Sequence, residues 1–543
     1  MKLKLPSYLF PLLMMLSVVI GIMIGTLITS KKHPTNKVQA LSQKYGQILH
    51  LLNEDYVDSI PLEDFNDEAI ESIIKKLDPH TRYIPKVKLK LAKTGLQKNI
   101  EGIGVEFKVI EDTLFVIKTV KNGPAELAGI LPGDKFTHVD GIDITGLNAS
   151  YEQIVNSLQG ASGSEVNITV FRNGQKQTLN VVRKSIKIDA VESAYLIDSI
   201  TGYIKLKAFA RGAHDEFESA LTLLNKEGMK NLIFDLRDNG GGLISEANNI
   251  LDELLPKGSL FVYTKGKNER SNTSYYANKE GLFEKGRLIV LINENAASAS
   301  EIVAGAIQGN DRGVIIGRRS FGKGLVQQPT QLIDGSELWF TISRYYTPSG
   351  RCIQKSYALG DSAYNSEYIN RFSSGELYTK DSIKVIDTLK YLTNNGRIVY
   401  GGGGIMPDIF VGLDTVAYTN YLGNLYAKDI LNMYAIKLYL QMKDSLKKIT
   451  FVDYRDEFAI SAEVYNSLVN FASKLGVEGS KSELLHSKSL ITTLLKALIA
   501  RIQWGDNEFY KIKNENDSII NESKTVMGND RFDDYLQPKN EKP

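Results

Sequence analysis

Two serines at the expected start of a helix are the first residues that could do nucleophilic chemistry. Ser298 and Ser300 follow an apolar run and precede the apolar face of that helix. The helix dipole and the N–H of Ala299 would stabilise an oxyanion beside Ser298. Ser298 and Glu301 also form a capping-box pattern, which satisfies helix-end donors without catalysis. The segment alone leaves a cap and a nucleophile both open.

A lysine between two glycines is the candidate general base for such a serine. Lys323 stands between Gly322 and Gly324, so other groups can approach it closely. In an extended segment its side chain would point the same way as that of Gln327. A lysine in a dry pocket can lose about three pKa units and accept a serine proton. The alternative is a solvated loop lysine.

The glycine-rich turn Leu236–Gly242 is the third candidate. Its consecutive N–H groups could form an anion-binding nest after a buried strand. The Walker spacing and its lysine are absent, which argues against a phosphate loop. A plain strand-to-helix turn is the alternative use.

Composition and the remaining titratable residues exclude several classes of protein. The 543 residues carry 65 Lys+Arg against 63 Asp+Glu, a net charge of +2, which argues against nucleic-acid binding. The single cysteine, Cys352, excludes an intramolecular disulfide, and the scattered histidines lack metal-ligand spacing. We therefore expect no metal and no cofactor. No G-x-S-x-G motif accompanies His214, which we expect on a helix surface, and we expect His80 in a structural turn.

The N-terminus predicts export. Residues 5–30 carry no charge and are flanked by lysines, and such a run is long enough to span a bilayer. A cleaved signal peptide is the alternative, although no clear cleavage site precedes Lys31. Both alternatives export the rest of the chain. We expect residues 1–32 to anchor it in the inner membrane, with the enzyme on the periplasmic side in a Gram-negative cell.

Hydrophobic periodicity divides the rest of the chain into four regions. The pattern is helical in 38–95, changes to short glycine-punctuated strands in 96–185, and becomes α/β in 186–412. Residues 413–543 are expected to be helical, with a polar, frayed stretch from Lys511 onward. The apolar runs 232–236, 288–292 and 314–316 predict strands covered on both faces. Each run precedes a loop of small polar residues, where open α/β sheets place their chemistry.

Six motifs together resemble the carboxyl-terminal processing peptidases, also called tail-specific proteases. They occur in that family's order and span roughly residues 40–412: Asp78–Tyr83, Gly102–Val105, Leu236–Gly242, Ser298–Glu301, Gly322–Gln327 and Gly401–Asp408. The resemblance implies a serine endopeptidase with an α/β protease core of crotonase-like ββα units. It also implies a PDZ-like domain inserted between the N-terminal helical region and the core.

The same resemblance assigns roles to individual residues. Ser298 matches the nucleophile, Lys323 the general base and Gln327 the residue that orients the lysine. The oxyanion donors would be the N–H groups of Ala299 and Gly241, the latter chosen among three adjacent glycines.

The PDZ-like segment implies the substrate class. Ile103, Gly104, Val105, Glu106 and Phe107 stand where a PDZ domain binds a C-terminal peptide by adding a strand to a sheet edge. The expected partners are unfolded or partly folded proteins with free C-termini. Residues 413–543 carry no interpretable motif; an adaptor protein and a homo-oligomer are further expected partners.

Overall fold

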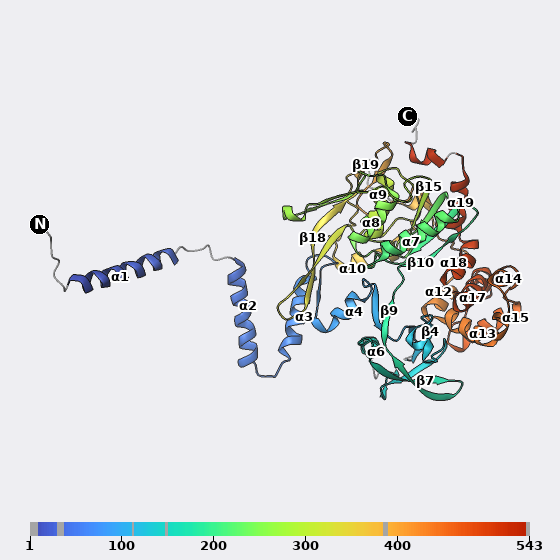
Figure 1. Ribbon diagram of the computed structural model, residues 1–543, viewed down its shortest axis with the longest axis horizontal. Helices are drawn as coiled ribbons and strands as arrows, with labels where there is room; N and C mark the ends of the chain where they lie inside the picture. The colour runs from blue at the N-terminus through green and yellow to red at the C-terminus, as the bar shows by residue number, and fades with distance from the viewer. Residues whose placement is uncertain are drawn as a thin grey trace. The chain divides into compact units, whose positions relative to one another are not determined.

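The computed structural model describes most of the chain: residues 9–29, 37–110, 113–146, 150–383, 389–530 and 532–538. Contacts separate it into two compact units, Met1–Lys76 and Leu77–Pro543, each taken by itself below (Figure 1).

The first unit is helical, as predicted for its part of the chain. It contains α1 (Leu9–Thr29), α2 (Lys37–Glu54) and α3 (Leu62–Ile74). The anchor expected over residues 1–32 falls partly on residues 1–8 and 30–32, which lie outside the described residues. Among the residues that are described, no helix combines the length and the apolar character needed to cross a bilayer.

The PDZ-like domain in the second unit is an antiparallel sheet with two short helices. The strands pair in the order β3–β4–β5–β7–β8, with β6 on β5. The elements are β3 (Val105–Ile110), β4 (Thr113–Thr119), α5 (Pro124–Leu127), β5 (Lys135–Val139), β6 (Ile142–Asp143), α6 (Tyr151–Leu158), β7 (Glu165–Arg172) and β8 (Gln175–Val182). An Asn-Gly pair is typical of a two-residue hairpin turn, and Asn173 and Gly174, both with positive φ, form such a turn between β7 and β8. Because β3 lies at the end of the sheet order, its outer edge can accept another strand.

Two strands enclose this domain in the sequence. β2 (Asn99–Gly102) pairs antiparallel with β9 (Lys184–Lys187), so the chain enters and leaves the domain side by side. Before β2 come a short 3-10 helix, Lys86–Lys88, and α4 (Leu89–Thr94). The PDZ-like domain therefore lies between two paired strands of the chain.

The α/β core is built on a largely parallel sheet. Its strands pair in the order β10–β11–β12–β15–β16–β21 and are parallel from β11 onward. They are β10 (Val191–Leu196), β11 (Thr201–Leu206), β12 (Asn231–Asp235), β15 (Arg287–Ile292), β16 (Val314–Gly317) and β21 (Ile409–Phe410). The three predicted apolar strands, now β12, β15 and β16, are confirmed and form the centre of this sheet. Their carboxyl ends meet at one edge, where the predicted loops follow.

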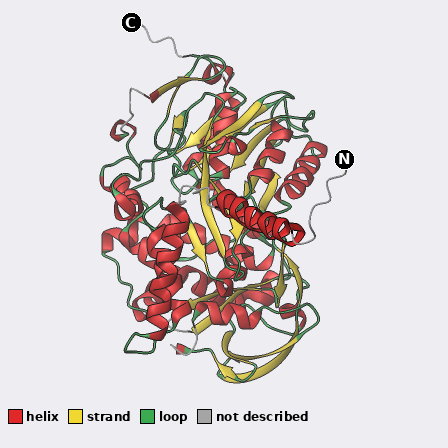
Figure 2. Ribbon diagram, turned by 90° about the vertical axis from the view of Figure 1, so that its left-hand side faces the viewer, coloured by secondary structure: helices red, strands yellow, loops and turns green. Residues whose placement is uncertain are grey.

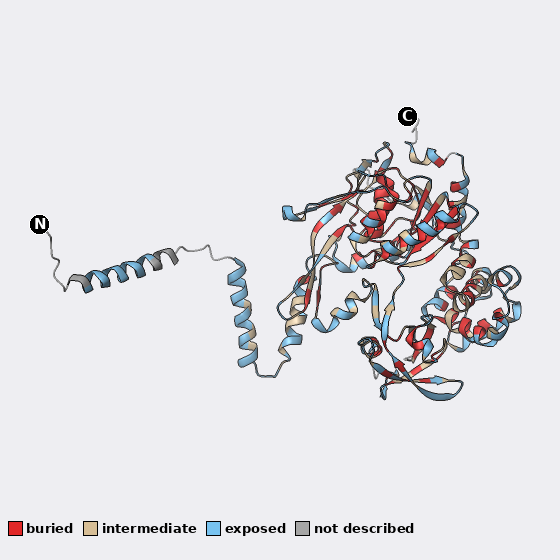
Figure 3. Ribbon diagram, in the orientation of Figure 1, coloured by how far each residue is buried: buried red, intermediate tan, exposed pale blue. Residues whose placement is uncertain are grey.

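Helices cover one face of this sheet (Figure 2). They are α7 (Ala213–Lys226), α8 (Ile244–Leu254) and α9 (Ala299–Gly309). Phe217 of α7, Leu251 of α8 and Val303 of α9 are fully buried with Phe234 and Val290 of the strands. Every residue of α9 is buried, as its red ribbon in Figure 3 shows, so the helix that follows Ser298 has little freedom to move.

The other face is covered by a late segment of the chain, against expectation. Residues 506–536 form α18 (Asp506–Lys513), α19 (Ser518–Gly528) and a 3-10 helix, Phe532–Leu536. Ile520, Val526 and Phe532 are almost fully buried against Ile233 and Ile289 of the sheet. The prediction of a frayed stretch from Lys511 was wrong, because a few well-spaced apolar residues hold this polar segment in place.

A second sheet contains the strand that follows the Lys323 loop. β17 (Leu325–Gln331) and β13 (Leu260–Gly266) both pair with β18 (Glu337–Tyr346), as does β1 (Arg82–Ile84) from before the PDZ-like domain. The remaining elements of the core are β14 (Ser274–Tyr276), α10 (Gly360–Asn365), α11 (Glu367–Ser373), β19 (Lys390–Leu392), β20 (Ile398–Tyr400) and 3-10 turns Glu269–Ser271 and Lys380–Ser382. β18 thus joins segments that precede and follow the inserted domain.

The predicted helical region has a hydrophobic core of its own. It comprises α12 (Asn420–Ala427), α13 (Ile430–Leu446), α14 (Phe451–Glu457), α15 (Ala462–Lys474), α16 (Lys481–His486) and α17 (Lys488–Gln503). It contacts the PDZ-like domain through ion pairs of Lys108 with Asp429, at 2.5 Å, and of Arg501 with Glu106, at 3.5 Å. A 3-10 turn, Asn514–Asn516, follows α18.

Candidate active site

Ser298 sits at a strained position before α9. Its backbone has φ 56° and ψ −113°, a combination that L residues rarely adopt. Such strain persists only where the surroundings hold it, and it is concentrated at functional sites. The side chain is half-buried at the carboxyl edge of the core sheet. A serine that served only as a helix cap would adopt a relaxed extended conformation instead.

Glu301 does more than complete a capping box. One carboxylate oxygen accepts the N–H groups of Ser298, at 2.9 Å, and of Lys323, at 2.8 Å. The other accepts the N–H of Gly322 at 2.7 Å and the hydroxyl of Ser320 at 2.5 Å. Glu301 is fully buried, and burial raises its pKa against the effect of these four bonds. This single carboxylate therefore joins the serine segment to the lysine segment.

Tyr345 of β18 joins the same two residues through their carbonyls. Its hydroxyl lies 3.1 Å from the carbonyl oxygen of Ser298 and 2.5 Å from that of Lys323. The ring is 1% exposed, so the hydroxyl has no access to bulk water. The single hydroxyl proton goes to the nearer carbonyl, that of Lys323, and the same oxygen contacts the carbonyl of Ser298, so Tyr345 spans the two segments. No local pattern in the sequence signals this contact, because Tyr345 lies on a strand remote from Ser298.

Lys323 is held where its glycine neighbours let the chain pack tightly. Gly322 has φ +91°, and a Cβ there would lie 3.1 Å from the N atom of Gly404; a Cβ on Gly324 would lie 2.9 Å from the N atom of Gln354. Burial lowers the pKa of Lys323, and the positive charge of Arg82 lowers it further. Both effects favour the neutral amine that a general base requires.

Gln327 lies on β17, four residues beyond the lysine. Its amide nitrogen is 3.5 Å from Oγ1 of Thr341 on β18. A register shift between Val326 and Gln327 interrupts the strand, so the simple alternation expected from Lys323 to Gln327 does not hold. Gln327 thus lies on the strand that follows the Lys323 loop, and its side-chain amide contacts Thr341.

The glycine-rich turn packs directly on Ser298. A Cβ on Gly241, which has φ +101°, would lie only 2.7 Å from the Cβ of Ser298. The N–H of Gly241, however, donates to Oδ1 of Asn239 at 2.9 Å. Gly241 therefore lies against Ser298, while its N–H is engaged by the side chain of Asn239.

Asn239 also binds the second candidate serine, Ser300. Its carbonyl accepts the hydroxyl of Ser300 at 2.8 Å, and Ser300 is fully buried. The alternative nucleophile is therefore enclosed and its proton is already used.

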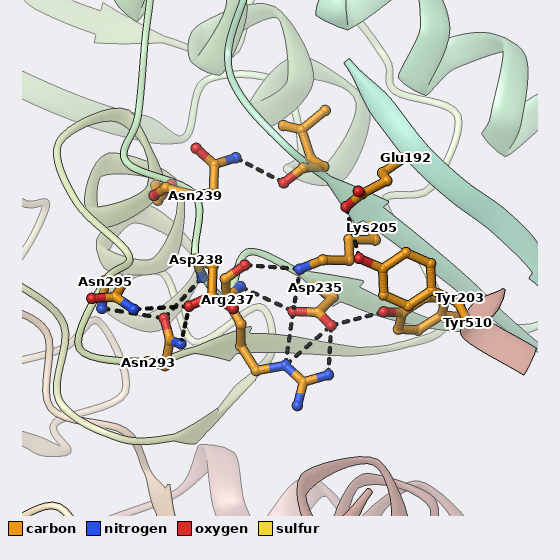
Figure 4. Close-up of polar contacts among 12 residues, drawn as sticks. Glu192, Tyr203, Lys205, Asp235, Arg237, Asp238, Asn239, Asn293, Asn295 and Tyr510 are labelled. Carbon is orange, nitrogen blue, oxygen red and sulfur yellow. Dashed lines mark hydrogen bonds and ion pairs between the residues drawn. The ribbon is translucent and has the colours of Figure 1, made fainter. Parts of the chain in front are cut away.

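A buried charge cluster supports this turn from below (Figure 4). Burial alone would raise the pKa of Asp235, but the guanidinium of Arg237 and the ammonium of Lys205 outweigh it and hold that pKa below its usual range. Asp235 also accepts the hydroxyl of Tyr203 at 2.8 Å, while Arg237 pairs with Asp517 of the late segment at 2.7 Å. The turn is thus fixed from both the strand and the covering segment.

The loops after β12 and β15 are joined as well. Asp238, with φ 63°, accepts the side-chain amides of Asn293 and Asn295 at 2.8 and 2.9 Å (Figure 4). These two bonds connect the turn to the loop that leads into Ser298.

The five predicted peptide-binding residues lie together at a cavity of about 490 Å³. Ile103, Gly104, Val105, Glu106 and Phe107 form one wall. Further wall residues come from α4, α6, β9, the segment after β11, α17 and α18: Leu91, Thr94, Tyr151, Val155, Leu158, Ile186, Lys207, Arg501 and Asp506. The edge of the PDZ sheet therefore borders a partly apolar groove to which several regions contribute.

His214 has a structural partner. Its Nε2 lies 2.9 Å from Oε1 of the buried Glu253, on the helix face that packs on α8. The surface position expected for His214 is therefore wrong, because the pairing with Glu253 keeps the ring largely covered. This pairing is structural and gives no support to a Ser–His–Asp triad that would use His214 and Asp215.

A serine segment and a buried-lysine segment joined through Glu301, together with a PDZ-like groove, fit a serine peptidase that carries a PDZ domain. Family models agree: residues 200–364 match peptidase family S41 and residues 102–182 match the PDZ domain. Residues 421–505 match a family of unknown function.

Curated relatives extend this match. A carboxy-terminal-processing protease of Bartonella bacilliformis is 32% identical over 345 residues, which cover 62% of this chain and 78% of that protein. A probable CtpA-like serine protease of Staphylococcus aureus is 32% identical over 343 residues, which cover 62% of this chain and 68% of that protein. The chain belongs to peptidase family S41 and is a carboxy-terminal-processing serine protease with a PDZ domain.

A solved structure is also similar in sequence. The photosystem II D1 C-terminal processing protease is 29% identical over 57% of this chain and 83% of its own. Its TM-score of 0.35 is too low to support a comparison of the two folds.

Proposed function

We propose that this protein cleaves exported polypeptides near their C-termini with a Ser298–Lys323 dyad. The observation that carries the proposal is the double connection of these two residues, through Glu301 at their N–H groups and through Tyr345 at their carbonyls. Four such contacts keep the relative position of the two segments constant, which a nucleophile and its base require.

The proposed reaction is acyl transfer in two steps. The neutral amine of Lys323 accepts the Ser298 proton as Oγ attacks the scissile carbonyl. The lysine then gives that proton to the departing amine, leaving an acyl group on Ser298. Water hydrolyses this ester with the same lysine as base, which restores the serine.

Stabilisation of the oxyanion requires a small local change. The N–H of Ala299, at the start of α9, is one proposed donor. Gly241 is the other, once its N–H leaves Oδ1 of Asn239 for the substrate oxygen. Substrate binding would thus complete the oxyanion hole, since the N–H of Gly241 would exchange the neutral Asn239 amide oxygen for a charged acceptor.

We infer that the PDZ-like groove binds the substrate's tail. The outer edge of β3 offers backbone groups to an extended peptide, and the loop at Gly104 would receive its carboxylate. Apolar residues such as Val155 and Leu158 suit an apolar last side chain. The substrates would be unfolded or partly folded proteins with free C-termini, recognised within residues 96–185 and cleaved within 186–412. A crotonase-like repeat in that core remains a prediction.

A tailed reporter tests this function. An unfolded polypeptide that ends in an apolar residue should be cleaved, and the same chain amidated at its end should be cleaved more slowly, because amidation removes the carboxylate charge. Ser298→Ala serves as the inactive control. Equal cleavage of both reporters across all concentrations contradicts tail recognition.

The PDZ-like domain could act as a gate, which activates the core when a tail binds, or as a tether, which only holds the substrate near the core. A free tail peptide added in trans distinguishes these two roles. A gate requires that the peptide bind the active arrangement better, about 1.4 kcal/mol of preference for a tenfold gain. It should then stimulate cleavage of a reporter that has no tail. A tether that only raises local concentration gives no stimulation.

Export is the second part of the proposal, and the charge-free run over residues 5–30 supports it. Deleting residues 1–32 should leave the protease in the cytoplasm, since that run would be the export signal. Fractionation of cells that express the full and the shortened chain measures this. A shortened chain that still reaches the exported compartment contradicts it. Extraction of the full-length protein from membranes by salt or alkali would decide against an anchor and for a cleaved signal.

A further inference from the structure

Four polar side chains form a line that begins in the Asp78–Tyr83 turn and ends at Gln327. Oδ2 of Asp78 accepts the hydroxyl of Thr81 at 2.6 Å. Oγ1 of Thr81 lies 3.5 Å from Oγ1 of Thr341, which in turn lies 3.5 Å from Nε2 of Gln327. The N–H of Thr341 also donates to Oγ1 of Thr81 at 3.2 Å. The line thus crosses from the turn before the PDZ-like domain to the strands that carry the lysine segment.

The donors and acceptors along this line can have only one direction. A hydroxyl has a single proton, and Thr81 gives its proton to the carboxylate in a short, charge-assisted bond. The contact between the two threonines therefore uses the proton of Thr341. Oγ1 of Thr341 is then left as an acceptor for the amide nitrogen of Gln327.

This direction determines which way the Gln327 amide is flipped. With Nε2 assigned to Thr341, the carbonyl oxygen Oε1 is the atom of the amide left to accept another donor. An ammonium needs such an acceptor, whereas a flipped amide would present N–H groups to it. The carboxylate of Asp78 is itself held in place, because its Oδ1 accepts the N–H groups of His80 and Thr81 at 2.9 and 3.0 Å.

We propose that Asp78, Thr81 and Thr341 are positioning residues that fix the Gln327 amide, so that its carbonyl oxygen stabilises the ammonium formed when Lys323 accepts the serine proton. The proposal rests on the Ser298–Lys323 dyad. It gives the Asp78–Tyr83 turn a part in the reaction, where the sequence indicated only a structural turn.

Charged side chains of this turn act electrostatically on Lys323. Arg82 and Asp78 from the turn and Glu301 from α9 shift the pKa of Lys323 in addition to burial. Burial and then Lys323 itself lower the pKa of His80 to about 4, so His80 is neutral at physiological pH. Nε2 of His80 lies 2.7 Å from the hydroxyl of Tyr364.

Thr341→Val tests the line, because valine keeps the branched shape and removes the hydroxyl. We expect kcat to fall about tenfold with little change in KM. The acid limb of the kcat profile should move to lower pH, since loss of a bond to the ammonium lowers the pKa of Lys323. Loosening of the structure would admit water and move that limb to higher pH. Thr341→Ser, which keeps the hydroxyl, should restore both kcat and the limb.

A double-mutant cycle makes the test specific. In a Gln327→Ala background, Thr341→Val should cause no further loss, because the group that it orients is gone. Thr81→Val interrupts the line one step earlier and replaces Thr341→Val if that variant unfolds, as judged by thermal unfolding. Additive losses, an acid limb that stays or moves to higher pH, or no rescue by serine would each overturn the proposal. Ser298→Ala and Lys323→Ala belong in the same assay: turnover by either one refutes the dyad itself, whereas two inactive variants with an additive cycle refute only the line.

Discussion

A Lys323→Ala variant is expected to lose turnover about as completely as Ser298→Ala, by roughly 10⁴-fold or more. Members of one nucleophile–base pair act as a unit, so the double variant should be no worse than either single one. The measurement is kcat on a tailed, unfolded reporter. Lys267→Ala, which removes an exposed lysine, is the matched control. Near-normal turnover by Lys323→Ala would contradict the dyad.

The same assay yields a pH profile whose sign follows from the structure. Only the neutral amine of Lys323 can accept the serine proton, so activity should rise as pH rises through its lowered pKa. Arg82 contributes to that lowering, so Arg82→Gln should move the acid limb to higher pH. An acid limb unaffected by Arg82→Gln would indicate that another group controls it.

Glu301→Gln should be the second most damaging change, although glutamine has nearly the same shape. All four partners of the carboxylate are donors, and three of them are backbone N–H groups that cannot turn away. The NH₂ of glutamine would face at least one of these N–H groups in either flip. An unsatisfied buried donor costs about 1–3 kcal/mol.

Both activity and stability report on this substitution. We expect kcat to fall by about 100-fold, because a small displacement between the serine and lysine segments is enough for such a loss. The midpoint of thermal unfolding should fall as well. Glu280→Gln, on an exposed glutamate, is the control. Wild-type kcat in Glu301→Gln would show that the two segments do not depend on this carboxylate.

Local patterns predicted much of this molecule. Continuous apolar runs identified β12, β15 and β16, and the Asn173-Gly174 turn identified a hairpin, because both are consequences of neighbouring residues. The order of the motifs located Ser298 and Lys323 on segments that the fold does bring together.

The missed features all depend on contacts between distant segments. Glu301 has the sequence of a helix cap, and only the fold shows that its carboxylate also reaches Gly322 and Lys323. Tyr345 is one aromatic residue among many on its strand. The segment 506–536 is polar on average, and its few apolar side chains acquire meaning only against the far face of the sheet. Composition and periodicity cannot indicate such partners.

The covering of that sheet face has a consequence for when activity can arise. Ribosomes make residues 506–536 after every residue of the proposed dyad, and Asp517 within them pairs with Arg237 of the glycine-rich turn. Until these residues are made, Ile233 and Ile289 have no cover and the turn beside Ser298 lacks one of its supports. A partly synthesised chain, which is itself an unfolded polypeptide, would therefore not yet contain a working protease. The order of translation would thus protect each new molecule from its own active site.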